Sequence, residues 1–184
     1  WDDAFATSLC LREKKVDLVS VVGGINTLVG GGELMCRILD CMGAPESTKV
    51  VLGCNSPEYL AQTYLEGSDW GKTYRNDCNV IGNAIWKDIE NARRRLLLGP
   101  ASAKFVAKTI LHLIEANDDK NENLTILCLG PLTNIACLVQ IADPIILSRI
   151  NLVIMGGAVC VHGNTPVADA EFNFNLDPSA AAIV

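Results

Sequence analysis

The 184-residue sequence is 49% hydrophobic and 20% charged, a composition typical of a globular domain and not of a disordered chain. Its net charge of −6 and the scarcity of clustered basic residues argue against a nucleic-acid partner. The one basic cluster, Arg93–Arg95, is expected to lie on a solvated helix face. No apolar run approaches the roughly 20 residues of a membrane-spanning helix, so no membrane partner is expected. The length suits a single domain over residues 1–184.

In chain order, short β-branched runs alternate with helical patterns. An acidic pair at residues 2–3 heads an apolar helix, and runs at 16–22, 49–53, 124–130 and 150–157 predict buried parallel strands. Helices are predicted at 31–43, which ends on a glycine, and at 101–117 and 132–143. Asp177 as N-cap and Pro178 at the first helical position predict a final helix. Residues 54–98 predict a long loop followed by one or two helices.

This alternation predicts an α/β fold, with an open, mostly parallel sheet and flanking helices. The eight cysteines show no CxxC pair and no Cys/His spacing of a zinc site. Most lie in apolar stretches, where cysteine behaves as a small buried hydrophobic residue. We therefore expect reduced thiols and a cytoplasmic location. The cysteines in apolar stretches are Cys10, Cys36, Cys128, Cys137 and Cys160.

Carboxylate and amide side chains either precede the first predicted helix or follow the predicted strands. Because ligands of open parallel sheets gather at the carboxyl ends of the strands, these side chains form the candidate site. Their oxygen atoms suit a hard cation such as Ca²⁺ or Mg²⁺ and a polyhydroxylated ligand. Aspartate and asparagine are also common helix-cap and turn residues, so the pattern alone leaves a purely structural interpretation open. The residues are Asp2, Asp3, Asn26, Asn134, Asn164, Glu171, Asn173 and Asp177.

Three blocks of sequence carry a more specific resemblance. They are WDDAFA at the start, LTILCLGPLTNIA from residue 124, and VIMGGAVCVHGNTPVADAEFNFNLDPSAA from residue 153. In this order they resemble the nucleoside hydrolase family, the inosine-uridine preferring nucleoside N-ribohydrolases, and the resemblance runs from the first residue to the last. It implies an enzyme that hydrolyses the N-glycosidic bond of a nucleoside and takes part in purine or nucleoside salvage.

The resemblance also implies roles for particular residues. Asp3 would bind Ca²⁺ together with the backbone carbonyl of Leu129, and Asp2 would take a ribose hydroxyl. The position of the acidic pair at a helix N-terminus is expected to keep both carboxylates ionised. Glu171 and Asn173 are expected to point the same way from extended chain. The residues expected around the ribose and its 5′-hydroxyl are Met155, Asn164, Glu171 and Asn173.

The mechanism implied is metal-assisted hydrolysis. A Ca²⁺-bound water would lose its proton to an aspartate and attack a sugar with oxocarbenium character. The family's upstream Asp-x-Asp, which contains the general base, and its C-terminal third are missing from these residues. We therefore expect a fragment that binds Ca²⁺ poorly and catalyses little. Members of the family are usually homo-oligomers, and we expect the same of the full-length protein.

Two further departures concern the substrate. Ungapped matching places Ile25 at a ribose-contacting position, whereas a one-residue shift would place Asn26 there, and Asn26 is preferred. The stretch SDWGKTYRND resembles the tryptophan-bearing loop of purine-specific members, so Trp70 would stack on a purine base, although packing on the core is the common fate of such a tryptophan. The alternatives are a hydrolase of pyrimidine or mixed specificity and a non-catalytic nucleoside- or ribose-binding homologue.

Overall fold

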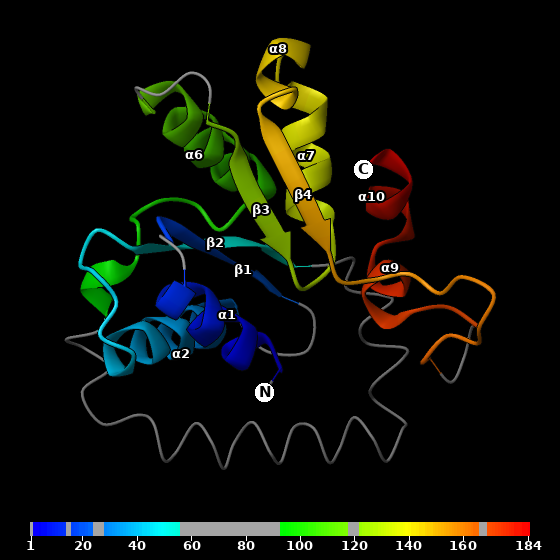
Figure 1. Cartoon of the computed structure of the whole chain (residues 1–184), viewed down its shortest axis with the longest axis horizontal. Coiled ribbons are helices and arrows are strands. Elements are labelled where there is room, and N and C mark those ends of the chain that lie inside the picture. The colour runs from blue at the N-terminus through cyan, green and yellow to red at the C-terminus, as the bar shows by residue number, and fades with distance from the viewer. Residues whose placement is uncertain (1, 14–15, 24–27, 56–92, 118–121, 166–168) are drawn as a thin grey trace. The chain divides into compact units, whose positions relative to one another are not determined.

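The structure is a computed structural model that describes residues 2–13, 16–23, 28–55, 93–117, 122–165 and 169–184 (Figure 1). The chain divides into two compact units, Trp1–Ala101 and Ser102–Val184, and each is described by itself. The expectation of a single domain over residues 1–184 stays a prediction.

The first unit packs helices against a pair of parallel strands. It contains α1 (Asp2–Glu13), β1 (Leu18–Gly23), α2 (Leu28–Cys41), β2 (Lys49–Asn55) and the short 3₁₀ helix η1 (Arg93–Arg95). β1 and β2 run parallel, with Leu18 opposite Lys49 and Val21 opposite Leu52. α2 packs against this strand pair, and apolar residues of α2, of β2 and of the turn between them form the core. The buried core residues are Cys36, Leu39, Ala44 and Val50.

The end of α2 shows why the predicted glycine stop works. Gly43 has a φ of +66°, a left-handed conformation that glycine adopts without steric cost. Its N–H donates to the carbonyl of Asp40, and the N–H of Ala44 donates to the carbonyl of Leu39. These two bonds form a Schellman motif, which satisfies the last carbonyls of the helix and turns the chain toward β2.

The second unit has the same parallel organisation. It contains α6 (Ala103–Ala116), β3 (Leu124–Cys128), α7 (Thr133–Ile141), α8 (Pro144–Leu147), β4 (Ile150–Ile154), α9 (Phe172–Leu176) and α10 (Pro178–Ile183). β3 and β4 pair in parallel from Leu124 opposite Ile150 to Cys128 opposite Ile154. The core lies where β3 meets α7 and α10, and its buried residues are Cys128, Leu132, Ile135, Ala136 and Ala180.

These elements confirm the α/β class, with parallel strands and flanking helices. Within the described residues the strands form two separate two-stranded sheets, β1–β2 and β3–β4. The expectation of buried strands is wrong for β4, where Leu152, Val153 and Ile154 are exposed. In the part of the chain that the structure describes, β4 pairs with β3 only, so the β-branched run marks the strand correctly without implying its burial. No described helix has the length and apolar character needed to cross a membrane.

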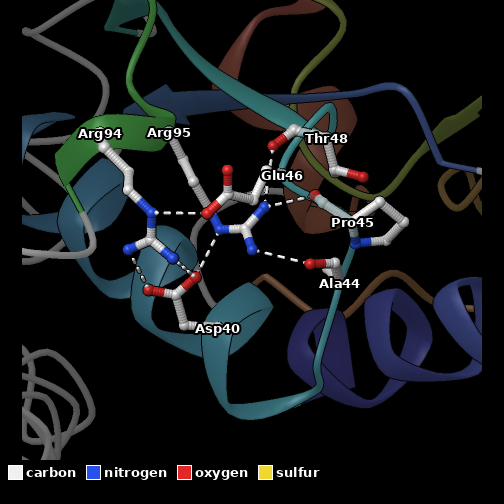
Figure 2. A network of polar contacts seen from close by, with 7 residues as sticks. All are labelled: Asp40, Ala44, Pro45, Glu46, Thr48, Arg94 and Arg95. Carbon is white, nitrogen blue, oxygen red and sulfur yellow. Dashed lines mark hydrogen bonds and ion pairs between the residues drawn. The ribbon is translucent and has the colours of Figure 1, made fainter.

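The basic cluster corrects another expectation. Arg95 is 2% exposed and does not lie on a solvated face, whereas Arg93 and Arg94 are exposed. The Arg95 guanidinium donates to the Asp40 carboxylate at 2.6 Å and to the carbonyls of Ala44 and Pro45 at 2.7 and 2.6 Å (Figure 2). A third carbonyl, that of Thr48, lies 3.2 Å away. A buried guanidinium is tolerated here because its donors meet acceptors on several sides.

The cysteines are only partly as expected. Every cysteine that the structure describes is free of a disulfide, and Cys36 and Cys128 are buried. Burial raises the pKa of each of these two thiols to about 11, so both remain protonated and unreactive at neutral pH. The expectation of burial is wrong for the other three cysteines in apolar stretches: Cys10 and Cys137 are half-buried, and Cys160, with a φ of +56° in the loop after β4, is exposed.

Candidate active site at the ends of β3 and β4

The Glu171 carboxylate organises the entrance to α9. Glu171 is 8% exposed and is the N-cap of this helix, with extended backbone angles. Oε1 accepts the N–H of Asn173 at 2.9 Å, while Oε2 accepts the N–H groups of Phe174 and Gly157, each at 3.1 Å. Three backbone donors therefore surround one carboxylate and hold it in a fixed orientation. The extended conformation expected for residues 171–173 is wrong, since α9 begins at Phe172.

Asn173 joins the carboxyl ends of two strands. Its side chain is buried, and Nδ2 donates to the carbonyl of Leu129 at 3.2 Å and to the carbonyl of Met155 at 3.3 Å. The Met155 Sδ atom lies 3.2 Å from the same nitrogen. Leu129 directly follows β3 and Met155 directly follows β4. The structure thus brings Leu129, Met155, Glu171 and Asn173 together at one edge of the β3–β4 pair.

Two glycines allow this close packing. A Cβ atom on Gly156 would lie 2.5 Å from the Phe174 ring and 3.2 Å from Glu171 Oε2. Gly157 has a φ of +84°, which L-residues with a side chain rarely adopt. The pair therefore lets the chain that leaves β4 pass directly over Glu171, and this places the Gly157 N–H on its carboxylate.

Asn164 lies in the long loop between β4 and α9 and approaches Glu171 and Asn173 from there. Its side chain is exposed, and Oδ1 accepts the N–H of Phe172 at 2.7 Å. The Asn164 carboxamide thereby belongs to the neighbourhood of Glu171 and Asn173 through a contact with the residue between them.

Asp177 has a structural role in the described unit. One carboxylate oxygen accepts the N–H of Ala180 at 2.9 Å and so caps α10, as the sequence predicts. The other accepts the hydroxyl of Thr133 at 2.6 Å. This buried carboxylate fastens α10 to the start of α7, and Asn134, which follows Thr133, is also buried. Asp177 and Asn134 therefore fit the purely structural interpretation that the sequence pattern leaves open.

Asp2 and Asp3 lie in the first turn of α1, and both are exposed. The Asp3 N–H donates to Asp2 Oδ1 at 3.2 Å. Partial burial, followed by the charge of Asp2, raises the pKa of Asp3. This direction is opposite to the expected effect of the helix N-terminus, because desolvation disfavours the charged carboxylate and the negative charge of Asp2 adds to that effect.

The chemistry of the donor atoms decides whether the candidate ligands suit a metal ion. Among the described residues, no group of three or more His, Cys, Asp and Glu side chains is placed so that it could hold a metal ion. The candidate ligands, the Asp3 carboxylate and the Leu129 carbonyl, are both oxygen donors, as a hard cation requires. A cation would offset the desolvation and the charge of Asp2, which together raise the pKa of Asp3. The residue types therefore fit such an ion.

Three sequence-based assignments lie outside the described residues: Trp70 and the alternatives Ile25 and Asn26. One feature of the site was missed from sequence. In the loop that carries Asn164, His162 Nδ1 lies 2.9 Å from Asp169 Oδ2. The pair lies in a loop, so the path of the loop brings the two side chains together, and no helix or strand periodicity marks this contact in the sequence.

The fold and the site together define a class of ligand-binding domain. A parallel α/β unit that gathers carboxylate and amide groups where its strands end is typical of a domain that binds a small polar ligand. The family model described as "inosine-uridine preferring nucleoside hydrolase" matches residues 1–184, and the chain belongs to this family.

Similar proteins include the pyrimidine-specific ribonucleoside hydrolase RihB of Escherichia coli O1:K1 and that of Escherichia fergusonii. Each is 26% identical over 189 residues, an alignment that covers 100% of this chain and 52% of the relative. The chain therefore spans about half the length of the curated relatives it matches.

Solved structures resemble the whole chain as well. An inosine-guanosine nucleoside hydrolase is 26% identical with a TM-score of 0.71, covering 99% of this chain and 52% of that one. A purine-preferring ribonucleoside hydrolase from Gardnerella vaginalis is 26% identical with a TM-score of 0.67, covering 99% and 53%. The inosine-uridine preferring nucleoside hydrolase from Bacillus anthracis is 25% identical with a TM-score of 0.61, covering 99% and 57%.

Proposed function

We propose that the whole protein hydrolyses the N-glycosidic bond of ribonucleosides and releases free base and ribose. Family membership supports the reaction. The observation that carries the proposal for this chain is the Asn173 carboxamide, which joins the ends of β3 and β4 beside the Glu171 carboxylate. Together these groups offer a buried set of oxygen and nitrogen atoms of the kind that recognises a sugar.

The residues of the chain would contribute chiefly by binding and by electrostatics. Hydrolysis builds positive charge on the sugar ring, and a fixed carboxylate stabilises that charge more than it stabilises the neutral substrate. Glu171 suits this role because three backbone N–H groups hold its carboxylate in place. Asn173, Asn164 and Met155 would surround the ribose, and Asp2 would accept a hydrogen bond from one of its hydroxyls.

We propose Ca²⁺ as the metal, with Asp3 and the Leu129 carbonyl among its ligands. When bound, this ion would lower the pKa of a water molecule and supply the attacking hydroxide. The Asp3 carboxylate would contribute negative charge to the metal site.

The proposed substrate preference is for purine nucleosides. It rests on the resemblance of the Trp70 loop to that of purine-specific members. The names of similar proteins include both purine-preferring and pyrimidine-specific hydrolases. Trp70→Ala in the full-length protein should reduce inosine turnover by at least about tenfold more than uridine turnover, because stacking on a purine is lost. Equal losses for the two nucleosides would contradict the preference.

The test of the reaction is base release from a panel of purine and pyrimidine ribonucleosides by the full-length protein, followed by chromatography. We expect free base and ribose in equal amounts, with release abolished by a calcium chelator and restored by added Ca²⁺. Tight nucleoside binding without release would instead favour a non-catalytic ribose-binding homologue. A lack of both binding and release would contradict the proposal altogether. We further propose a cytoplasmic homo-oligomer that acts in nucleoside salvage, in keeping with the free thiols of the described cysteines.

A further inference from the structure

The loop between β4 and α9 is held together by one carboxylate that the proposed reaction does not use. Asp169 Oδ1 accepts the backbone N–H of Gly163 at 2.8 Å. Its other oxygen, Oδ2, lies 2.9 Å from His162 Nδ1. Because an ionised carboxylate can only accept, the His162 proton is on Nδ1 in this contact. Asp169 thus makes contacts with two consecutive residues on the opposite side of the loop.

Backbone packing next to this carboxylate is unusually close. A Cβ atom on Gly163 would lie 2.1 Å from the carbonyl carbon and oxygen of Ala170, so only glycine fits. The N–H and hydroxyl of Thr165 both donate to the Ala170 carbonyl, at 3.2 and 3.0 Å. The two sides of the loop therefore approach each other at backbone contact distance over residues 163–165 and 169–170.

Asn164 sits between these contacts. It is flanked by Gly163, which is bound to Asp169, and by Thr165, which is bound to Ala170. Its own Oδ1 accepts the Phe172 N–H, which makes Nδ2 the atom that would donate to a sugar hydroxyl. Its exposed position means that Asn164 depends on these neighbours, rather than on core packing, for a fixed orientation.

We propose that Asp169 is a positioning residue that, with His162, latches the loop and fixes the Asn164 carboxamide beside Glu171 for ligand binding. The inference rests on the proposed function for the identity of the ligand, whereas the latch itself stands on the geometry. The Asp169 and His162 side chains are 65% and 95% exposed, and an exposed pair of this kind contributes little by itself. The latch matters because the same carboxylate also holds the backbone next to Asn164.

The test is a double-mutant cycle in the full-length protein, with base release from inosine as the assay. In Asp169→Asn, the single carboxamide oxygen can accept a hydrogen bond from the Gly163 N–H or from His162 Nδ1, but one of the two acceptor oxygens is lost. We therefore expect KM to rise about three- to tenfold, with kcat changed by less than about twofold. In the Asn164→Ala background, the same change should alter KM by less than about twofold, because the group that Asp169 positions is already gone. His162→Ala should raise KM less than Asp169→Asn does.

Two further measurements keep the result interpretable. Asp143→Asn is the matched control, since Asp143 also accepts a backbone N–H, that of Ile145 at the start of α8, and it should leave KM unchanged. Amide hydrogen exchange at Gly163 should be about three- to tenfold faster in Asp169→Asn than in the wild type, whether or not nucleosides are hydrolysed.

An unchanged KM in Asp169→Asn, or an equal KM rise in both backgrounds, would overturn the positioning role. Unchanged exchange at Gly163 would overturn the latch itself. If the wild type releases no base but exchange at Gly163 responds as expected, the proposed function fails and the latch stands.

Discussion

At the scale of single residues, one buried carboxamide ties the second unit together at the site. The resemblance singles out Glu171 and Asn173 in the sequence, and both side chains are buried in the structure. Their conformation could not be predicted, since glutamate is not a favoured N-cap and α9 is only five residues long. The contact of Asn173 with Leu129 joins residues 44 apart and depends on the pairing of β3 with β4.

Asn173→Asp tests the importance of the donated hydrogen bonds. The substitution preserves shape but places a carboxylate oxygen opposite the carbonyls of Leu129 and Met155, which only accept. We expect the free energy of unfolding to fall by about 1–3 kcal/mol at pH 7, measured by urea denaturation. Asn175→Asp, in the same helix, is the control and should change it by less than about 0.5 kcal/mol. Equal stabilities of the two variants would show that the Asn173 contacts are unimportant.

At the scale of elements, Arg95 connects η1 to the end of α2 and to the turn that precedes β2 (Figure 2). The strands and most helices follow from periodicity and cap signals, which are local. The role of Arg95 cannot be predicted from such local signals, because three consecutive arginines look alike in the sequence. The one that becomes buried is decided by a turn about 50 residues away along the chain.

Arg95→Ala and Arg94→Ala form a matched pair. Both guanidinium groups bind Asp40, but the Arg94 side chain is 41% exposed and that of Arg95 is 3% exposed. Loss of Arg95 removes the more buried of the two guanidinium partners of Asp40 and a donor to three carbonyls, so the free energy of unfolding should fall by about 3–5 kcal/mol. Loss of Arg94 should cost at most about 1 kcal/mol. If urea denaturation gave similar losses of unfolding free energy for the two variants, Arg95 would not be the residue that connects η1 to α2 and to the turn before β2.

The same carboxylate gives a pH-dependent prediction. Burial acts to raise the pKa of Asp40, but the guanidinium groups of Arg95 and Arg94 outweigh it and hold this pKa below its ordinary value. A depressed pKa means that Asp40 stabilises the fold above the pKa it has in the unfolded chain. This stabilisation is lost as pH falls through the pKa in the folded protein.

Wild type and Asp40→Asn should therefore differ by a constant free energy of unfolding between pH 7 and pH 5. The difference should shrink below about pH 4, where the aspartates of unfolded chains take up protons. Urea denaturation at pH 7, 5 and 3 measures it. A difference that is the same at pH 3 as at pH 7 would exclude the proposed ionic role of Asp40.

At the scale of the whole molecule, the sequence supports an acidic α/β protein of the nucleoside hydrolase family. The α/β class could be predicted because parallel strands and their helices alternate along the chain. The exposure of β4 could not, because hydrophobic runs report strand propensity and carry no information about which neighbours cover them. The central claim is the proposal that the acidic pair of α1 and the Glu171–Asn173 group both serve the same reaction in the whole protein.

Calcium-dependent release of base from inosine by the full-length protein tests this claim most directly, with Asp3→Asn and Glu171→Gln compared with wild type. Asp3→Asn should raise the Ca²⁺ concentration for half-maximal activity by about tenfold or more, because a ligand is lost. Glu171→Gln should lower kcat/KM by about tenfold or more without changing this Ca²⁺ concentration. Release of base that ignores both substitutions and persists with a chelator would contradict the account.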